Sequence, residues 1–382
     1  MKKRILTALA VMMSVSAFSQ INVKTEKGDM NVRFIGRTNF DAGTYISSSE
    51  ADMPERNGIS MNDTRLGVTT TFDEKWSSKI EVCYANKAIS FRDLWIGYQL
   101  TDNSKITVGN HFQPYGAKIL GLAYKFVEDA SADYAFCPSR KIGVSYAYAS
   151  NKLNVTAGLF SDGNVDNGKN VNKGYSIAAK AIFRPISKDE SVLHFGFAQM
   201  FVDSPNDLTF NGIIPNTVIS KTLASAKFDQ TDDVEWYTRV EAEALFIKGK
   251  FYAEAHYLGT YIRFPETDDD FSILDHYNDG WYAQASYLIK GEKQNYNKKT
   301  GLAASASPKS LEVLARISNI DLRDWELLDK QTDFTLGVNY FFNKNLNVKL
   351  NYIYAKVKGN DIENRYVEND YNMIQTRLQF SF

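Results

Sequence analysis

The final segment of the chain, residues 371–382, alternates between two kinds of side chain up to the terminal phenylalanine. One set of alternate positions is mostly apolar and the other mostly polar: Ile374, Thr376, Leu378, Phe380 and Phe382 against Met373, Gln375, Arg377, Gln379 and Ser381. Because side chains in a strand point to opposite faces in turn, this pattern predicts a strand with one apolar and one polar face. An ordinary edge strand of a soluble protein has the same pattern, so the remaining chain must decide between the two.

The same alternation recurs along most of the chain, in about sixteen segments separated by polar connections. These segments are residues 32–41, 63–72, 80–84, 94–100, 105–111, 142–148, 153–160, 175–184, 193–202, 236–247, 251–257, 281–289, 311–317, 334–342, 346–354 and 371–382. Each strand with its connection takes about 23 residues, which is in the range of bacterial barrels. We therefore predict an all-β fold, a transmembrane antiparallel barrel of about 16 strands formed by residues 20–382.

The first residues have the pattern of a removed export signal. Lys2, Lys3 and Arg4 are basic, residues 5–15 are apolar, and Ala17 and Ser19 are small residues at cleavage-site spacing. This apolar stretch is shorter than the about 20 residues of a membrane-spanning helix. We predict that residues 1–19 form a signal peptide and that any membrane-spanning segment in the mature chain is a strand.

The connections are predicted to alternate between short turns and long external loops. The third external loop, residues 112–139, is unusual because it contains Ile119, Leu120, Leu122, Tyr124, Phe126 and Val127. A long, partly apolar loop in a β-protein is usually functional, so we expect it to fold into the barrel. The alternative is a short helix at the barrel mouth. Residues 291–310 are long where a short turn is expected, so either they fold into the pore or one strand is miscounted.

Several motifs resemble the phosphate-selective porin O and P family, in the order in which they occur there. They are RDLWIGY (92–98), ITVGNHFQPYG (106–116), RKIGV (140–144), YAQASYL (282–288), SLEVLAR (310–316) and TLGVNY (335–340). The resemblance implies a trimeric porin of sixteen strands whose third loop folds inward. The chain end also resembles the C-terminal signature of outer-membrane barrels, in which Leu378, Phe380 and Phe382 would form the signal read by the assembly machinery.

Phosphate-selecting members of the family line their constriction with basic residues. Positions of the same kind form the predicted anion path: Arg33, Arg37, Arg65, Lys118, Lys125, Lys180, Arg239 and Arg316. Acidic residues are predicted on the same lumen face: Asp63, Glu241, Glu243 and Glu312. Residues two apart on a strand lie about 6–7 Å from each other. We therefore expect Asp63 to cancel part of the charge of Arg65, and Glu241 that of Arg239, which predicts weak ion selectivity.

Other functions have little support in the sequence. The four histidines are far apart along the chain and none has metal-ligand spacing, so we predict no metal site and no cofactor. His194 and His256 both alternate into the lumen, which argues against an outer-membrane lipase and any other enzyme. The formal net charge of −1 gives no reason to expect nucleic-acid binding. Cys83 and Cys137 either form a disulfide between wall and loop or remain two separate thiols.

The sequence thus predicts a porin of the bacterial outer membrane that lets small hydrophilic solutes or anions, among them phosphate, diffuse through a water-filled lumen. Its expected partners are outer-membrane lipid, the barrel assembly machinery and two further copies of itself. The alternative is a plugged, non-conducting barrel that acts as an anchor or interaction partner.

Overall fold

The computed structural model describes residues 20–382 except 26–27, 49–56, 62, 86–87, 117–124, 162, 164–173, 204–207, 214–221, 229–233, 265–274, 324–327 and 361–365. The predicted signal peptide, residues 1–19, lies outside the described residues. Strands dominate the described part, which also contains the short helix α2 (Ser131–Phe136). In this part of the chain no helix is both long and apolar enough to cross a membrane.

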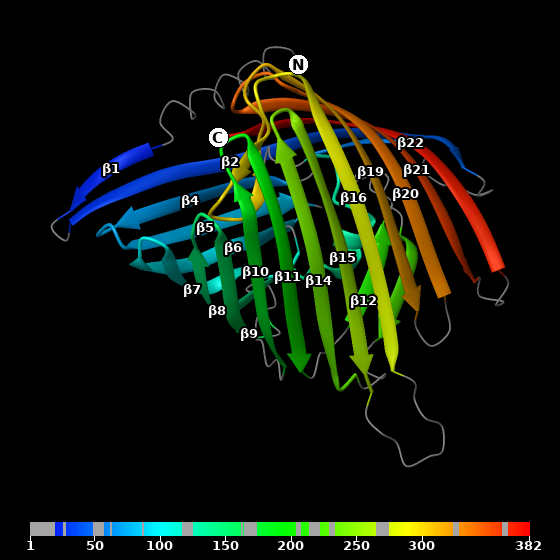
Figure 1. The fold of residues 1–382 in the computed structure, drawn as a ribbon, viewed down its shortest axis with the longest axis horizontal. Coiled ribbons are helices and arrows are strands. Elements are labelled where there is room, and N and C mark those ends of the chain that lie inside the picture. The colour runs from blue at the N-terminus through cyan, green and yellow to red at the C-terminus, as the bar shows by residue number, and fades with distance from the viewer. Residues whose placement is uncertain are drawn as a thin grey trace.

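Sixteen of the described strands pair antiparallel in one closed ring, which confirms the predicted fold (Figure 1). In ring order they are β2 (Gly28–Ser48), β4 (Thr64–Phe72), β5 (Trp76–Ala85), β6 (Ala88–Thr101), β7 (Ser104–Phe112), β8 (Arg140–Ala149), β9 (Leu153–Ser161), β10 (Tyr175–Ser187), β11 (Ser191–Asp203), β14 (Trp236–Lys248), β15 (Phe251–Arg263), β16 (His276–Lys290), β19 (Ser310–Arg323), β20 (Leu328–Phe341), β21 (Leu346–Asn360) and β22 (Tyr366–Ser381). Each strand therefore pairs with its neighbours along the chain, and only one pairing joins distant segments.

That distant pairing closes the ring between β2 and β22, where Arg37 lies opposite Ser381 and Asp41 opposite Arg377. The chain end itself takes part, since the backbone N–H and carbonyl of Phe382 both bond to Gly36 at 3.0 Å. The ring of Phe382 lies against Gly36, where a Cβ atom would collide with it. The absence of a side chain at Gly36 thus allows the Phe382 ring to pack against β2.

Two short strands that are not part of the ring pair with β2. β1 (Gln20–Thr25) pairs with the first residues of β2, and the resulting hairpin projects beyond the other strands (Figure 1). β3 (Asn57–Ser60) pairs with the second half of β2 and precedes β4 on the same edge, so β3 and β4 act as one interrupted strand. Asp63 lies in the interruption with φ of +60°, a conformation that aspartate tolerates better than most residues.

Burial follows the predicted alternation because one face of each strand points out of the barrel and the other into it. On β22, Leu378 is 41% exposed and Ile374 39%, whereas Gln375, Arg377 and Gln379 are nearly buried. The outer surface is apolar and the inner wall largely polar, the reverse of a soluble protein. This distribution stabilises a barrel that is surrounded by lipid.

The outer face of β14, β15, β16 and β19 has a band of small residues between two rows of aromatic ones. Trp281 and Tyr257 lie opposite each other on one side of the band, and Tyr287 and Phe251 on the other. A hollow of about 490 Å³ lies between them, lined in part by Ala244, Ala253, Ala255, Ala283, Ala285 and Ala315. The aromatic rows are six residues apart on β16, about 20 Å along the strand, and rows of this kind flank the apolar band of outer-membrane barrels.

The two ends of the barrel differ. At one, here called the turn end, strands are joined by residues 73–75, 102–103, 150–152, 188–190, 249–250 and 342–345. The other, the loop end, carries the third loop (residues 113–139) and a hairpin of β12 (Leu208–Ile213) and β13 (Thr222–Phe228). One longer connection at the turn end forms the hairpin β17 (Asn295–Asn297) and β18 (Leu302–Ala304). The ring therefore has no miscounted strand at residues 291–310.

Candidate functional site

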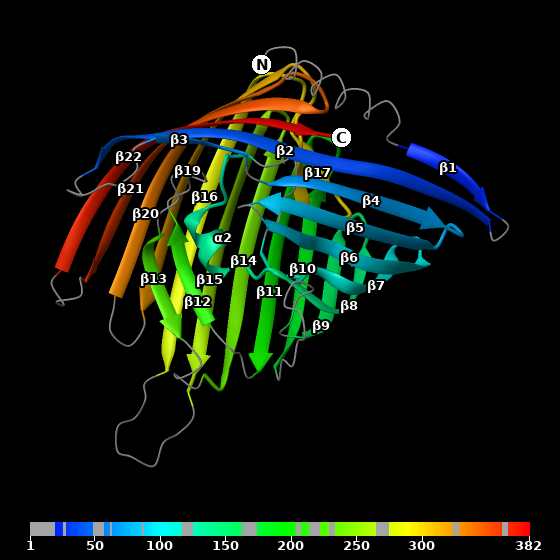
Figure 2. The same cartoon turned by 180° about the vertical axis from the view of Figure 1, so that it is seen from behind.

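The described residues of the third loop lie inside the barrel, as predicted, and their short helix α2 packs against the inner wall instead of capping the barrel mouth (Figure 2). Basic side chains of the inner wall hold the loop by donating hydrogen bonds to its backbone carbonyl oxygens. The pairs are Lys180 with Gly116 (3.1 Å), Arg316 with Glu128 (2.9 Å), Arg239 with Phe136 (2.5 Å), Arg377 with Val127, and Lys349 with Phe126 (3.4 Å). Charged donors make such bonds stronger than neutral ones, so the loop is firmly attached to β10, β14, β19, β21 and β22.

Apolar packing fixes the same loop on its other side. Phe136 of α2 packs with Phe210 of β12, their ring centroids 5.3 Å apart, and both belong to a buried apolar cluster. The cluster also includes inward residues of the wall, among them Met200, Leu258 and Ile320. Beside it, a cavity of about 20 Å³ between the loop and the wall has room for about one water molecule. The loop and the β12–β13 hairpin thus fill this side of the lumen (Figure 2).

The β17–β18 hairpin enters the lumen from the turn end, which settles the prediction left open for residues 291–310. Its Tyr296 hydroxyl lies 2.9 Å from Nδ1 of His194 and accepts a bond of 3.3 Å from the fully buried Arg184. Asn154 donates to the carbonyl of Lys298 at 3.0 Å. At the rim, the hydrogen bond from Lys293 lowers the pKa of Asp189 and raises that of Lys293.

The third loop and the β17–β18 hairpin meet at Glu312 of β19. The ammonium group of Lys125 lies 2.5 Å from Glu312 Oε1 and donates to Gln294 Oε1 at 2.8 Å. Gln294 in turn donates to the same carboxylate oxygen at 3.0 Å. All three side chains are buried, so neither the lysine nor the glutamate is available to a passing solute.

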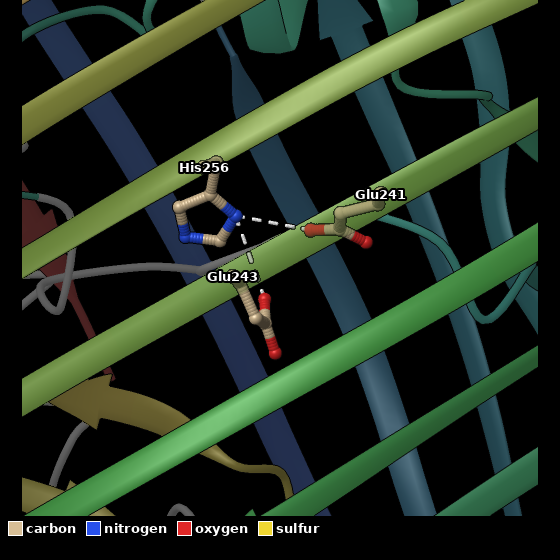
Figure 3. A group of neighbouring side chains, drawn as sticks. All are labelled: Glu241, Glu243 and His256. Atoms are coloured by element: carbon tan, nitrogen blue, oxygen red, sulfur yellow. Dashed lines mark hydrogen bonds and ion pairs between the residues drawn. The ribbon is translucent and has the colours of Figure 1, made fainter.

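A second buried charge cluster lies under the start of the third loop, on β10, β11, β14 and β15. Glu241 and Glu243 project from β14, and His256 faces them from β15, as Figure 3 shows. Nδ1 of His256 is 3.0 Å from Glu241 Oε1, and Lys180 is 2.8 Å from Glu243 Oε2. The backbone N–H of Gly116 donates to Glu241 Oε2 at 2.7 Å. The sequence shows no metal-ligand spacing here because these residues become neighbours only through strand register.

The opposite side of the lumen carries a chain of alternating charges, here called the charge belt. In spatial order it consists of Arg37, Asp63, Arg65, Glu81, Lys79, Asp93 and Arg140, on or beside β2, β4, β5, β6 and β8. Arg65 is 3.1 Å from Glu81, Glu81 is 2.8 Å from Lys79, and Asp93 is 2.7 Å from Arg140. Asp63 bridges Arg37 and Arg65.

Exposure separates the belt from the buried clusters. The side chains of Asp63, Lys79 and Arg65 are 24%, 15% and 14% exposed, whereas those of Glu241 and Glu312 are 0% exposed. The described residues of the third loop attach mainly to β10 and to β14 through β22, away from the belt. The other belt members, Arg37, Glu81, Asp93 and Arg140, are at most 9% exposed, so the belt meets water mainly at Asp63, Lys79 and Arg65.

The predicted anion-path residues are thus distributed over several environments. Arg37 and Arg65 lie in the charge belt with Asp63, while Lys180, Glu241 and Glu243 lie in the buried cluster. Lys125 pairs with Glu312, Arg33 is exposed near the start of β2, and Lys118 lies outside the described residues. Whether any of them lines an ion path remains a prediction.

One expected pair makes its direct contacts elsewhere. Arg239 and Glu241 are on the same strand face, but each contacts other groups. Arg239 reaches the carbonyl of Phe136 at the end of α2, and its guanidinium lies 5.1 Å from the centre of the Tyr237 ring. Glu241 takes Lys180 and His256 from the neighbouring strands instead. The contacts of an inward-folded loop, which alternation does not reveal, decide both partners.

Six further residues belong to the charge belt or hold the inserted segments. Alternation along the strands indicates that they face the lumen, but it does not reveal which residues they contact. Lys79, Asp93 and Arg140 complete the belt, and Arg184, Lys349 and Arg377 hold the inserted segments. Arg140 is the first residue of the RKIGV motif, so that motif was the sequence feature that could have indicated its role.

The two cysteines form no disulfide with each other in the structure, which describes both. Cys83 Sγ is 3.5 Å from Asp63 and Cys137 Sγ is 3.2 Å from Asp133, each pointing to a different acid. We expect two titratable thiols per chain when the protein is denatured without reductant. Finding none, with two appearing only after reduction, would instead demonstrate the bridge between wall and loop.

Comparison with known proteins gives a consistent result. The family model described as phosphate-selective porin O and P matches residues 32–382. Porin O of Pseudomonas aeruginosa is 29% identical over 195 residues, which is 47% of this chain and 40% of Porin O. The match to this relative therefore spans less than half of the relative's length.

Solved structures share the fold at low identity. OmpT of Vibrio cholerae, described in its trimer form, is 15% identical, and the alignment covers 92% of this chain and 99% of OmpT with a TM-score of 0.55. An anion-selective porin from Comamonas acidovorans is 13% identical over 92% of this chain and 100% of that chain, with a TM-score of 0.56. At these identities the likeness concerns the barrel architecture alone.

Proposed function

Because the chain belongs to the phosphate-selective porin O and P family, we propose that small hydrophilic solutes diffuse passively through its lumen along the charge belt. As a porin it is a β-barrel of the bacterial outer membrane and acts as a channel rather than as an enzyme. Short turns of such barrels face the periplasm, so the turn end is the periplasmic end and the third loop enters from outside.

The observation that carries this proposal is the asymmetric lumen. The third loop and two hairpins occupy the side of β10 to β19, where apolar packing excludes water. On the other side, the belt presents partly exposed polar side chains. A solute that exchanges hydration for contacts with fixed charges can move along such a wall without a cofactor or turnover.

We further propose that this path is only weakly selective between ions. Each base of the belt has an acid within ion-pair distance: Asp63 for Arg37, Glu81 for Arg65, and Asp93 for both Lys79 and Arg140. The partners lie well inside the Debye length of about 8 Å, so each charge cancels much of its neighbour's field in the lumen before salt screens it. A site for phosphate would need several bases without such partners, because a carboxylate already takes their hydrogen bonds.

Reversal potentials in a KCl gradient across a planar bilayer test this proposal. We expect discrete conductance steps and a reversal potential close to zero. Phosphate at low concentration should leave the chloride current unchanged. As a comparison, Glu81→Gln removes one belt acid and should shift the reversal potential toward anions. Strong anion selectivity of the unmodified protein, with block by phosphate, would contradict weak selectivity and support phosphate transport.

A second function, a plugged barrel that serves as an anchor, is favoured by one observation. The third loop and the β17–β18 hairpin are joined inside the lumen through Lys125, Gln294 and Glu312. A fully plugged barrel would give no conductance steps in the same bilayer recording, which separates the two functions directly.

The assembly state is also a proposal. OmpT, which shares the barrel architecture, is described as a trimer, and we propose that this chain forms a homotrimer after insertion by the barrel assembly machinery. Light scattering of the purified protein, corrected for bound detergent, gives the mass of three chains if this is correct and of one chain if it is not.

A further inference from the structure

The buried cluster of Glu241, Glu243 and His256 has a composition that a diffusion path does not require. These residues offer one ligand atom each, and the atoms lie within 4.8 Å of one another. The two carboxylates and the imidazole converge from adjacent strands (Figure 3). We propose that this cluster binds one zinc ion and that the ion fixes the base of the third loop.

The distances suit a first shell of nitrogen and oxygen ligands. His256 Nδ1 is 3.0 Å from Glu241 Oε1 and 3.5 Å from Glu243 Oε2. In a tetrahedral zinc site with bonds of about 2.0–2.2 Å, neighbouring ligand atoms are about 3.3–3.6 Å apart. The three ligand atoms lie within 4.8 Å of one another, so their separations would have to close by at most about 1.5 Å to reach this range.

A second observation points to a missing partner at the same place. Glu243 Oε1 and His194 Nε2 are both buried, make no hydrogen bond, and face each other at 3.4 Å. His194 is 2% exposed, and its other ring nitrogen lies 2.9 Å from the Tyr296 hydroxyl, which holds the ring in this orientation. At 3.4 Å the two atoms form a weak ion-pair contact, longer than a good hydrogen bond, which leaves both open to a further ligand.

Charge balance supports a divalent cation. Glu241, Glu243 and Glu254 are at most 6% exposed, and Lys180 is the ammonium group that pairs with the first two. With neutral imidazoles, three carboxylates and one ammonium group leave a formal charge of −2, which one zinc ion neutralises. Burying charge that is not compensated is unfavourable. Protonating both histidines is the other way to reach balance, and it would remove the imidazole ligand of the zinc site.

The ion would act on the loop through groups already in contact. Glu241 accepts the N–H of Gly116 at 2.7 Å, and Lys180 donates to the carbonyl of the same residue at 3.1 Å. Lys180 also competes with the metal, because its ammonium lies 3.2 Å from Glu241 Oε2 and 2.8 Å from Glu243 Oε2. Removing this positive charge should therefore strengthen zinc binding, whereas a purely structural ion-pair cluster would only lose stability.

Isothermal titration of the folded, EDTA-treated barrel with ZnCl₂ at neutral pH tests the inference. We expect one zinc per chain, a higher unfolding temperature with zinc, and no comparable effect of CaCl₂. The isosteric change Glu243→Gln should weaken binding by more than about 100-fold, and Lys180→Met should strengthen it. The control His111→Ala changes another lumen histidine, bonded to Ser145, and should bind zinc like the unmodified chain.

Heat-dependent migration on gels establishes that each variant is folded before titration. The inference is overturned if the unmodified folded barrel takes up no stoichiometric zinc. It is also overturned if folded Glu243→Gln binds zinc as tightly as the unmodified chain, since the ion is then adventitious. Conductance measurements do not enter this test, so the proposed porin function stands or fails separately.

Discussion

Leu336→Arg is expected to prevent stable insertion of the barrel. Leu336 lies on the outer face of β20, 45% exposed, between the outward residues Phe334 and Val338. Its ring neighbours are Ala315 of β19 and Tyr352 of β21, and Ala315 belongs to the alanine band between the aromatic rows. An arginine near mid-membrane on this surface costs about 2–4 kcal/mol, enough to reduce the inserted fraction at least about tenfold.

Folding into vesicles of defined lipid, followed by protection from added protease, measures this effect. The matched control Leu336→Phe keeps the site apolar and should insert with a yield near that of the unmodified chain. A full yield of protease-protected Leu336→Arg would show that β20 does not face lipid at this height. Expression level alone is not a readout, because quality control removes slowly assembling barrels.

Opening of the lumen is the second large effect, expected for the double variant Arg239→Met and Arg316→Met. Arg239 bonds to the carbonyl of Phe136 at one end of α2, and Arg316 bonds to the carbonyl of Glu128 before it. Each hydrogen bond from a charged donor contributes about 1.5–3 kcal/mol, so losing both weakens the inward position of the loop by about 3–6 kcal/mol. That loss corresponds to at least about a hundredfold larger population of displaced loops.

Single-channel recording detects this as larger conductance steps with more current noise. Arg323→Met changes an exposed arginine at the end of β19; it is the matched control and should keep the original step size. If the unmodified barrel is plugged, the double variant should turn a silent protein into a conducting one. Unchanged step size and noise in the folded double variant would mean that apolar packing of Phe136 and Phe210 alone holds the loop.

The ring of strands was predictable because its signal is local. Alternation such as that of Ile374, Gln375 and Thr376 follows from strand geometry and the lipid surroundings, and it needs no knowledge of neighbours. The inward fold of the third loop was predictable for the same reason, since its apolar residues have no place in an exposed loop. The count of strands also allowed residues 291–310 to be recognised as exceptional.

The charge partners were beyond prediction because strand register decides them. Gly196 lies opposite Glu243, and Glu243 opposite His256, which brings His194 and His256 to one carboxylate although they are far apart in sequence. A shift of one residue would send these side chains to the outside. Turn geometry and bulges fix the register, and neither leaves a clear pattern in a single sequence.

The barrel can close only when β2 pairs with β22, so this pairing constrains the order of the folding steps. Arg377 and Asp41 are 336 residues apart, so the contact that joins them has close to the largest sequence separation the chain allows. Bringing such distant segments together costs chain entropy before any bond between them forms. Topologies of this kind therefore fold slowly. Until β22 has paired with β2, both strands keep an unpaired edge that can bind other chains. The exported chain must therefore be kept from aggregating until this pairing closes the ring.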